Sequence, residues 1–134
     1  MLTHIEKQLC ESAITVRKNA YAPYSKFKVG VAILDELKNI HLGVNVENAA
    51  YPQGTCAEAG AISSMIASGG KKIKLIAISG SGSELCTPCG GCRQKIREFS
   101  ALKTPVLICD EEMFQKRFIL EALLPASFGP DNLF

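Results

Sequence analysis

The sequence predicts an α/β protein built on a mixed β-sheet of about five strands. Apolar stretches of strand length are followed, more than once, by stretches of helical periodicity that span about ten residues or more. This alternation favours some parallel strand pairing, because a helical crossover returns the chain in the same direction. An early pair of strands is joined by a short turn, and this hairpin adds an antiparallel pair to the sheet.

The 134 residues are expected to form one domain over residues 1–134, because a chain near this length buries roughly 70% of its unfolded surface. Hydrophobic residues make up 47% of the sequence, charged residues 21%, and the formal net charge is +2. This balance indicates a soluble protein. It lacks the strong excess of basic residues that is typical of a protein that binds nucleic acid. No signal peptide and no membrane span are recognised, so we expect a cytoplasmic protein that binds no membrane.

The sequence contains six cysteines, at positions 10, 56, 86, 89, 92 and 109. Because no export signal is found, reduced thiols and a bound metal are expected rather than disulfide bonds. Cys10 and Cys109 lie in apolar surroundings and are expected in the core.

The first half of the chain predicts a helix and then a β-hairpin. A helix is expected over residues 3–19, because Thr3 and Glu6 have the spacing of a capping box and apolar residues follow at helical intervals. Over residues 27–34, every second residue is a large apolar one, which predicts a strand with one strongly apolar face. Residues 40–44 are then expected to be the returning strand of the hairpin.

The second half predicts helices and strands in alternation. The expected elements are a helix over 56–68, a strand over 73–79, a helix over 89–99 and a strand over 105–109. Asp110 is interpreted as the N-cap of a further helix through Gln115. Residues 117–120 fit either a last strand or a continuation of this helix. The two histidines, His4 and His41, are both expected at the surface.

Two short motifs carry the strongest chemical signal, Cys56-Ala57-Glu58 and Pro88-Cys89-Gly90-Gly91-Cys92. Three thiolates can occupy three of the four tetrahedral positions of zinc and leave the fourth for water, which is typical of a catalytic site. Glu58 lies two residues after Cys56 and is placed to move the protons of that water. The spacing matches the three-cysteine form of the zinc deaminase signature H-x-E…P-C-x-x-C. Both motifs fall at expected helix starts, where free N–H groups help to stabilise thiolates.

The same residues allow structural interpretations. Glu58 follows Thr55 at the spacing of a capping box, so it could serve only to bind the Thr55 N–H group. Cys86 and Cys89 form a second C-x-x-C pair, which could be a redox pair. Cys86 as a fourth ligand would instead close the metal site and exclude catalysis.

Five motifs occur in order along nearly the whole chain. They are residues 24–30 (YSKFKVG), 45–49 (NVENA), 56–58 (CAE), 88–94 (PCGGCRQ) and 123–128 (LLPASF). Together they resemble the small, homotetrameric cytidine deaminases. The resemblance implies a three-layer α/β/α fold, zinc as cofactor, and a nucleoside substrate. It also implies a homotetramer that hydrolyses cytidine and deoxycytidine to uridine and deoxyuridine with release of ammonia, a reaction of pyrimidine salvage.

The resemblance assigns roles around the metal. Cys56, Cys89 and Cys92 would bind zinc. Glu58 would be the catalytic residue that passes protons between the attacking water, N3 of the pyrimidine and the leaving amine. Ala57 would present backbone groups to the base.

The resemblance also assigns contacts to the nucleoside. Phe27 would stack on the pyrimidine, and its place at the start of an apolar strand face gives the alternative of a core residue. Asn45 and Glu47 would hold the ribose hydroxyls, and a carboxylate there would repel a phosphate, which favours a free nucleoside. Phe128 would close the site of a neighbouring subunit, or would anchor the C-terminal tail.

One position departs from the pattern of many relatives, which carry an arginine directly after the catalytic glutamate. Here that residue is Ala59, so the charge of three thiolates has to be offset elsewhere. Arg93, adjacent to Cys92, and the helix N-termini are the candidates.

Two alternative functions share the zinc motifs. The first is deamination of another aminopyrimidine nucleoside or of a nucleoside antibiotic, which would differ in the sugar-binding and C-terminal residues. The second is a zinc-stabilised module without enzymatic activity. Glu58 is the residue that discriminates an enzyme from such a module.

Overall fold

The computed structural model describes residues 1–134 and contains a five-stranded sheet with the strand order β2-β1-β3-β4-β5. The strands are β1 (Gly30–Asp35), β2 (Ile40–Val44), β3 (Ile73–Ser79), β4 (Pro105–Cys109) and β5 (Phe114–Ile119). Only β3 and β4 pair in parallel, and the other neighbouring strands are antiparallel. The expected mixed sheet is confirmed.

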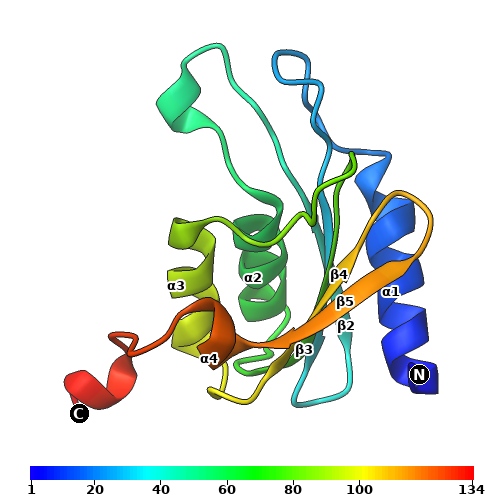
Figure 1. The fold of residues 1–134 in the computed structure, drawn as a ribbon. Helices are drawn as coiled ribbons and strands as arrows, with labels where there is room; N and C mark the ends of the chain where they lie inside the picture. Colours follow the sequence, from blue (N-terminus) through cyan, green and yellow to red (C-terminus); the bar gives the residue numbers. More distant parts are fainter.

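Helices cover both faces of this sheet, as Figure 1 shows. Helix α1 (His4–Arg17) lies on one face, and α2 (Ala57–Ala67) and α3 (Gly90–Phe99) lie on the other. The remaining elements are the short helix α4 (Leu120–Leu123) and two 3-10 turns, η1 (Tyr51–Gln53) and η2 (Pro130–Asn132). The three-layer α/β/α fold is confirmed. No helix combines the length and the apolar composition that a membrane crossing requires.

The sheet divides the hydrophobic core into two parts. Ile76 and Ile78 of β3 pack with α2 and α3, whereas Ala77 between them packs with α1. Because successive strand residues face opposite sides, a strand covered on both faces is apolar throughout. Cys10 and Cys109 are buried in the part beneath α1, as the sequence predicts.

Two glycines let helices rest directly on the sheet. A Cβ atom at Gly43 of β2 would lie 2.3 Å from the backbone nitrogen of Ala61 in α2. A Cβ atom at Gly30 of β1 would lie 2.3 Å from the carbonyl oxygen of Ala13 in α1. Any side chain at these positions would push a helix away from the sheet. The depth of α2, and of the site residues at its start, therefore depends on Gly43.

The first helix begins as expected. The Glu6 N–H group donates to Thr3 Oγ1 at 3.2 Å, and the Thr3 N–H group donates to Glu6 Oε1 at 2.9 Å, which completes a capping box. The helix ends at Arg17, earlier than the expected residue 19. Strand β1 begins at Gly30 and not at residue 27, because the segment before it is held by side chains that follow β2.

The expectation of a surface position for His41 is wrong. His41 is 6% exposed, and its Nε2 atom lies 2.7 Å from Oδ2 of the buried Asp35. Helix α2 packs on the face of β2 that contains His41 and Gly43, and so covers the imidazole. The polar character of histidine leads to the expectation that His41 faces the solvent, but residue type does not show which face of β2 a helix covers.

The helix expected from Asp110 to Gln115 is also wrong. Asp110 Oδ1 accepts hydrogen bonds from the N–H groups of Glu112 at 2.7 Å and Met113 at 2.8 Å. These bonds form a turn that leads into β5, which pairs with β4. An aspartate can satisfy backbone donors in a turn as well as at a helix N-cap, so the residue type alone did not distinguish the two.

Candidate metal and catalytic site

Three cysteines meet at the N-termini of α2 and α3. Cys56 is the N-cap residue of α2, Cys89 is the N-cap residue of α3, and Cys92 lies in the first turn of α3. Their sulfur atoms all lie within 4.8 Å of one another. A tetrahedral zinc ion with Zn–S bonds of about 2.3 Å holds its sulfurs about 3.8 Å apart, so the three thiols fit zinc with small adjustments.

Burial and hydrogen bonding have opposite effects on the pKa values of these thiols. The N–H group of Cys92 donates to the Cys89 sulfur and lowers the pKa of that thiol. Burial raises the pKa values of Cys56 and Cys92. Metal binding displaces thiol protons, so a bound cation would turn this set of thiols into thiolates.

Glu58 supplies a carboxyl group to the same place. It lies in the first turn of α2 and is 5% exposed. Burial raises the pKa of this carboxyl, while its own N–H group and the Cys92 thiol act in the opposite direction. The contact with Cys92 places the carboxyl beside the sulfur cluster. A carboxyl with a raised pKa holds a proton more readily, so it can both accept and donate a proton there.

The capping interpretation of Glu58 does not hold. The Thr55 N–H group donates to the Val46 carbonyl oxygen at 2.9 Å and not to Glu58. The N-cap residue of α2 is Cys56, one position later than a Thr55 capping box requires, and it makes no side-chain capping bond. The Glu58 carboxyl is therefore available to the site.

Cys86 lies outside the group of three sulfurs. Its side chain packs against the core beneath α2 and α3, and a Cβ atom at Gly80 would lie 2.4 Å from its sulfur. Burial, together with the charge of Glu58, raises the pKa of the Cys86 thiol to about 11. Its place outside the group of three sulfurs argues against a fourth ligand, and a thiol with a raised pKa is not activated for redox chemistry.

Arg93 braces the turn before α3. Its Nε atom donates to the Pro88 carbonyl oxygen at 2.6 Å, and Nη2 donates to the Thr87 hydroxyl at 3.0 Å. Its Nη1 atom donates to the Leu123 carbonyl oxygen at 2.7 Å. Each guanidinium nitrogen is thus bound to an oxygen and none donates to a sulfur. Arg93 therefore ties the turn to α4, and does not replace by sulfur contact the arginine that is lacking at Ala59.

Asn45, directly after β2, holds the segment that contains Phe27. Asn45 Nδ2 donates to the Phe27 carbonyl oxygen, and Asn45 Oδ1 accepts from the Val29 N–H group, both at 2.8 Å. Phe27 is 41% exposed, so it is not a core residue. Lys26 before it has a φ of 62°, in the left-handed region, and turns the chain at this point. The Phe27 backbone is thus held on a surface loop while much of its ring stays accessible.

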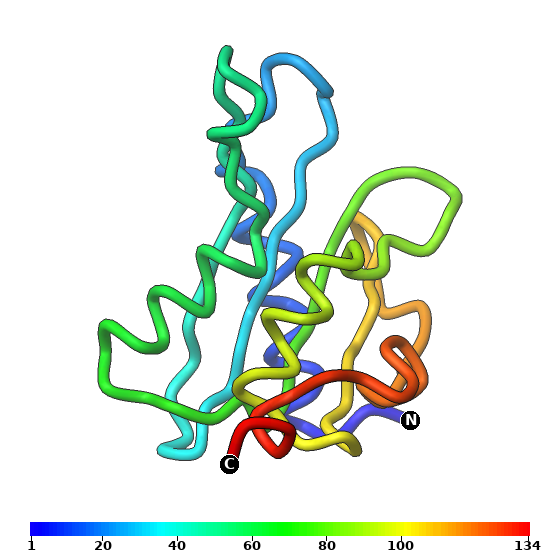
Figure 2. Tube along the Cα trace, turned by 90° about the vertical axis from the view of Figure 1, so that its left-hand side faces the viewer, coloured from blue at the N-terminus to red at the C-terminus, as the bar shows by residue number.

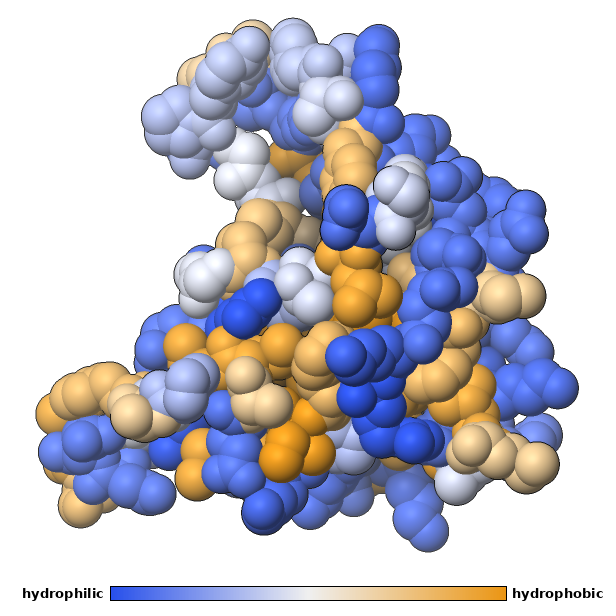
Figure 3. All heavy atoms as spheres, in the orientation of Figure 1, coloured by the Kyte–Doolittle hydropathy of each residue, from blue (hydrophilic) through white to orange (hydrophobic).

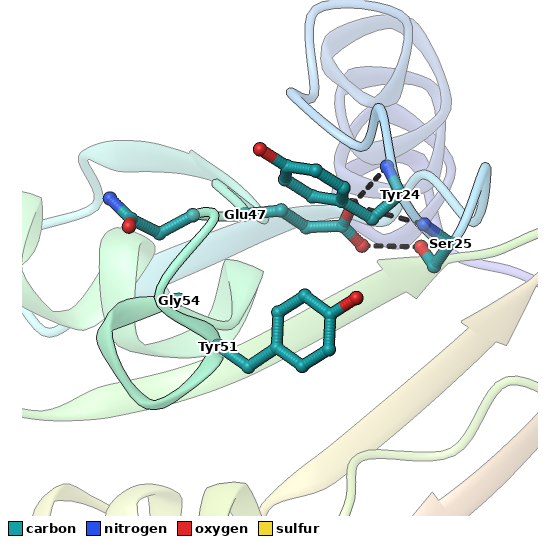
Figure 4. A pocket seen from close by; sticks show the side chains of 6 residues that line it. Tyr24, Ser25, Glu47, Tyr51 and Gly54 are labelled. Atoms are coloured by element: carbon teal, nitrogen blue, oxygen red, sulfur yellow. Dashed lines mark hydrogen bonds between the residues drawn. The ribbon is translucent and has the colours of Figure 1, made fainter.

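Glu47 holds the same loop from its other end, as Figure 4 shows. Glu47 Oε1 accepts from the N–H groups of Tyr24 at 2.9 Å and Ser25 at 3.1 Å. Glu47 Oε2 accepts from the Ser25 hydroxyl. The Ser25 hydroxyl bond and then the two N–H bonds lower the pKa of this carboxyl, so it is ionised at neutral pH. Oε2 accepts a single bond and keeps a lone pair for another donor.

A pocket of about 400 Å³ opens beside Glu47. Its lining residues are Tyr24, Ser25, Glu47, Asn48, Tyr51 and Gly54. The rings of Tyr24 and Tyr51 meet edge to face, with their centroids 6.0 Å apart. We did not predict a site role for these tyrosines from the sequence. Large aromatic residues within otherwise polar loops were the available signal.

Two projecting loops form this pocket. Residues 21–27 and 45–55 rise together above the sheet, as Figures 1 and 2 show. A backbone bridge between Tyr21 and Val46 joins the two loops, and a bridge between Val46 and Thr55 joins the two ends of the second loop. Figure 3 shows that the surface is hollowed between the projecting loops and the layer of α2 and α3.

The two other expected site residues lie at opposite extremes of burial. Ala57 is the first residue of α2 and is 1% exposed. Phe128 lies beyond α4 and is 57% exposed, while its carbonyl oxygen accepts a 2.8 Å hydrogen bond from Gln94 Nε2. The backbone at Phe128 is therefore anchored to α3, but the ring is not buried against its own chain.

These features define a class of site. Three thiols that fit one zinc ion lie beside a buried carboxyl, and no fourth cysteine joins them. Within an α/β/α fold, this arrangement is typical of a zinc-dependent hydrolytic enzyme, whose metal keeps one position open for water.

Known proteins match the chain along most of its length. Residues 3–108 match the family model for the cytidine and deoxycytidylate deaminase zinc-binding region. The chain is 36% identical over 129 residues to the cytidine deaminase of Sporosarcina psychrophila. The aligned region covers 96% of this chain and 94% of that protein. It is 37% identical over 123 residues to the cytidine deaminase of Mycobacterium tuberculosis, which covers 91% and 88%.

A solved structure gives the same result. The crystal structure of cytidine deaminase from Burkholderia pseudomallei aligns with a TM-score of 0.86 at 36% identity, over 95% of this chain and 100% of that chain. The chain therefore belongs to the cytidine and deoxycytidylate deaminase family.

Proposed function

We propose that this chain is a zinc-dependent cytidine deaminase, which converts cytidine and deoxycytidine to uridine and deoxyuridine and serves pyrimidine salvage. The observation that carries the proposal is the buried Glu58 carboxyl beside the thiols of Cys56, Cys89 and Cys92. The relatives support it, because the proteins compared above are named cytidine deaminases.

The proton transfers are assigned to Glu58. Zinc, when bound by the three thiolates, lowers the pKa of a water molecule and makes it a nucleophile at neutral pH. Glu58 accepts a proton from the water as its oxygen bonds to C4 of the pyrimidine, and it donates a proton to N3. Glu58 then carries the second proton of the water to the amino group, the C4–N bond breaks, and ammonia leaves. One water is consumed and nothing is oxidised or reduced.

Nucleoside recognition is assigned to the loops around β1 and β2. Phe27 stacks on the pyrimidine, and the backbone of Ala57 binds the base. Asn45 and Glu47 bind the ribose hydroxyls. The free lone pair on Glu47 Oε2 and the exposed ring of Phe27 support these contacts. The ionised Glu47 also repels a phosphate, so a free nucleoside is the preferred substrate and nucleic acid is not a partner.

We further propose that residues 1–134 act as one domain within a cytoplasmic homotetramer. In this assembly Phe128 of one subunit reaches the site of a neighbour, because an aromatic ring that is 57% exposed gains free energy when a partner covers it. All six cysteines are free thiols. The metal site requires three of them to stay reduced, which favours the cytoplasm.

A substrate panel tests this function. The purified protein is incubated with cytidine, deoxycytidine, cytosine and deoxycytidine monophosphate, the loss of ultraviolet absorbance is followed, and zinc per chain is measured. We expect turnover of both nucleosides, slower turnover of the base and the nucleotide, and about one zinc per chain. Chelation should abolish turnover, and added zinc should restore it.

Two outcomes would contradict the proposal. Turnover of another aminopyrimidine nucleoside or of a nucleoside antibiotic, without turnover of cytidine, would show that the substrate is wrong. Zinc binding without turnover of any of these compounds would favour a zinc-stabilised module.

A further inference from the structure

Helix α3 holds the C-terminal segment through two side chains. Arg97 Nε donates to the Ser127 hydroxyl at 2.9 Å, and Gln94 Nε2 donates to the Phe128 carbonyl oxygen at 2.8 Å. Residues three apart on a helix share a face, so the two side chains hold adjacent residues of the segment. The same helix contains Cys92. A single rigid element therefore connects the metal cluster to the backbone at Phe128.

Arg97 is buried without a carboxylate partner. It is 8% exposed and forms none of the salt bridges of the chain. A desolvated cation without an opposite charge is costly, so ion pairing does not explain an arginine here. Its guanidinium lies against Gly129, where a Cβ atom would be 2.4 Å from Arg97 Cζ. Gly129 has a φ of −155°, which any residue adopts, so the effect of a side chain there would be to displace the Arg97 guanidinium.

The segment is strained immediately before the point that Arg97 holds. Ala126 has a φ of 50°, in the left-handed region, which is unfavourable for alanine. Such a conformation persists only where neighbouring contacts enforce it. The bond from Arg97 to Ser127 is such a contact. A strained and clamped backbone thus leads to Phe128, whose ring is left 57% exposed.

We propose that Arg97 is a positioning residue, which fixes the backbone around Phe128 so that the ring is set in advance for the nucleoside site of a second copy of this chain. The inference rests on the proposed function, in which Phe128 acts in a neighbouring subunit. A ring that is ordered before association avoids the entropy cost of ordering it on binding. Gln94 assists through the Phe128 carbonyl, and Gly129 leaves room for the guanidinium.

Arg97→Lys tests the proposal, because lysine keeps the positive charge but lacks the planar group and the Nε donor. We expect KM for cytidine to rise about three- to tenfold, with kcat, zinc content and oligomeric mass unchanged. Ser127→Ala removes only the bonded hydroxyl and should raise KM in the same direction, which keeps the test valid if Arg97→Lys folds poorly. Arg117→Lys, at an arginine that binds Glu6, is the matched control and should leave KM unchanged.

A double-mutant cycle separates positioning from simple stabilisation. If Arg97 acts through Phe128, Arg97→Lys should no longer change KM in the Phe128→Ala background. An effect of the same size in both backgrounds would overturn the inference. An unchanged KM in Arg97→Lys and Ser127→Ala, with a raised KM in Phe128→Ala, would also overturn it while the role of Phe128 stands. An unchanged KM in Phe128→Ala would remove that role, and the inference with it.

Discussion

Asn45 binds the backbone on both sides of Lys28. Its Nδ2 atom donates to the Phe27 carbonyl oxygen, and its Oδ1 atom accepts from the Val29 N–H group, at 2.8 Å in each case. The Asn45 amide has two N–H donors, and one of them remains for a substrate hydroxyl. One side chain can therefore hold the residue that is proposed to stack on the pyrimidine and also bind the ribose.

Asn45→Asp should raise KM for cytidine by about tenfold or more, because a carboxylate cannot donate to the Phe27 carbonyl oxygen and repels it. Steady-state kinetics with cytidine measures the effect. Asn19→Asp, at an exposed position after α1, is the control for the same change of charge. Equal KM values in the two variants would mean that the Asn45 amide contributes nothing to nucleoside binding.

Glu58→Gln should lower kcat by a factor on the order of 10² to 10⁴, the usual contribution of a general acid or base. Zinc content and melting temperature should stay close to the parent values, because glutamine has nearly the same shape. Glu11→Gln, at an exposed position of α1, is the matched control. Near-normal turnover in Glu58→Gln would defeat the proposed proton transfers.

Cys89→Ser and Cys86→Ser should behave differently, although both residues come shortly before α3 in the sequence. Cys89 belongs to the sulfur cluster, so its replacement should abolish zinc binding and turnover. Cys86 stands outside the cluster, and its replacement should leave zinc per chain unchanged. Metal analysis and activity are measured on each variant. Loss of zinc from Cys86→Ser would show that the ligand set is wrong.

Asp35→Asn should lower the free energy of unfolding at pH 7 by about 1–3 kcal/mol, because the buried carboxylate binds His41. Burial opposes ionisation of Asp35, but bonds from His41 and from the Asn39 and Leu37 N–H groups outweigh it and lower the pKa of the carboxyl. A lowered pKa gives stability that is present above the unfolded value of about 3.9 and is lost as the pH falls through the folded value.

Urea unfolding of the parent and Asp35→Asn at pH 7, 5 and 3 checks this dependence. The difference in unfolding free energy between the two proteins should be similar at the two higher pH values and smaller at the lowest. A difference that stays constant to the lowest pH would show that the ionised form of Asp35 is not what stabilises the fold.

Mixed oligomers of Glu58→Gln and Phe128→Ala chains test the sharing of sites between subunits. If Phe128 acts in a neighbour, an intact Glu58 site on a Phe128→Ala chain gains a ring from the Glu58→Gln chain. Cytidine turnover below KM should then exceed the average of the two separate variants. A mixed sample, prepared by co-expression, whose activity equals that average would show that Phe128 acts only within its own chain or not at all.

Much of the fold and of the metal site is determined by local patterns in the sequence. The spacing of Cys89 and Cys92 places both sulfurs on one helical turn, and the capping box of Thr3 and Glu6 marks the start of α1. The apolar runs that predict the strands are also local patterns. They depend only on the order of apolar and polar residues that are close together in the sequence. Sequence distance is short in each case, so the pattern predicts the structure.

The tertiary structure decided which surfaces are covered and which donors meet which acceptors. His41 is buried because α2 packs on its face of β2, and Asp110 begins a turn because β5 pairs with the free edge of β4. Arg97 meets Ser127, which lies thirty positions further along the chain, and a helical period cannot encode that distance. These contacts depend on how complete elements pack together, so residue type and spacing could not predict them.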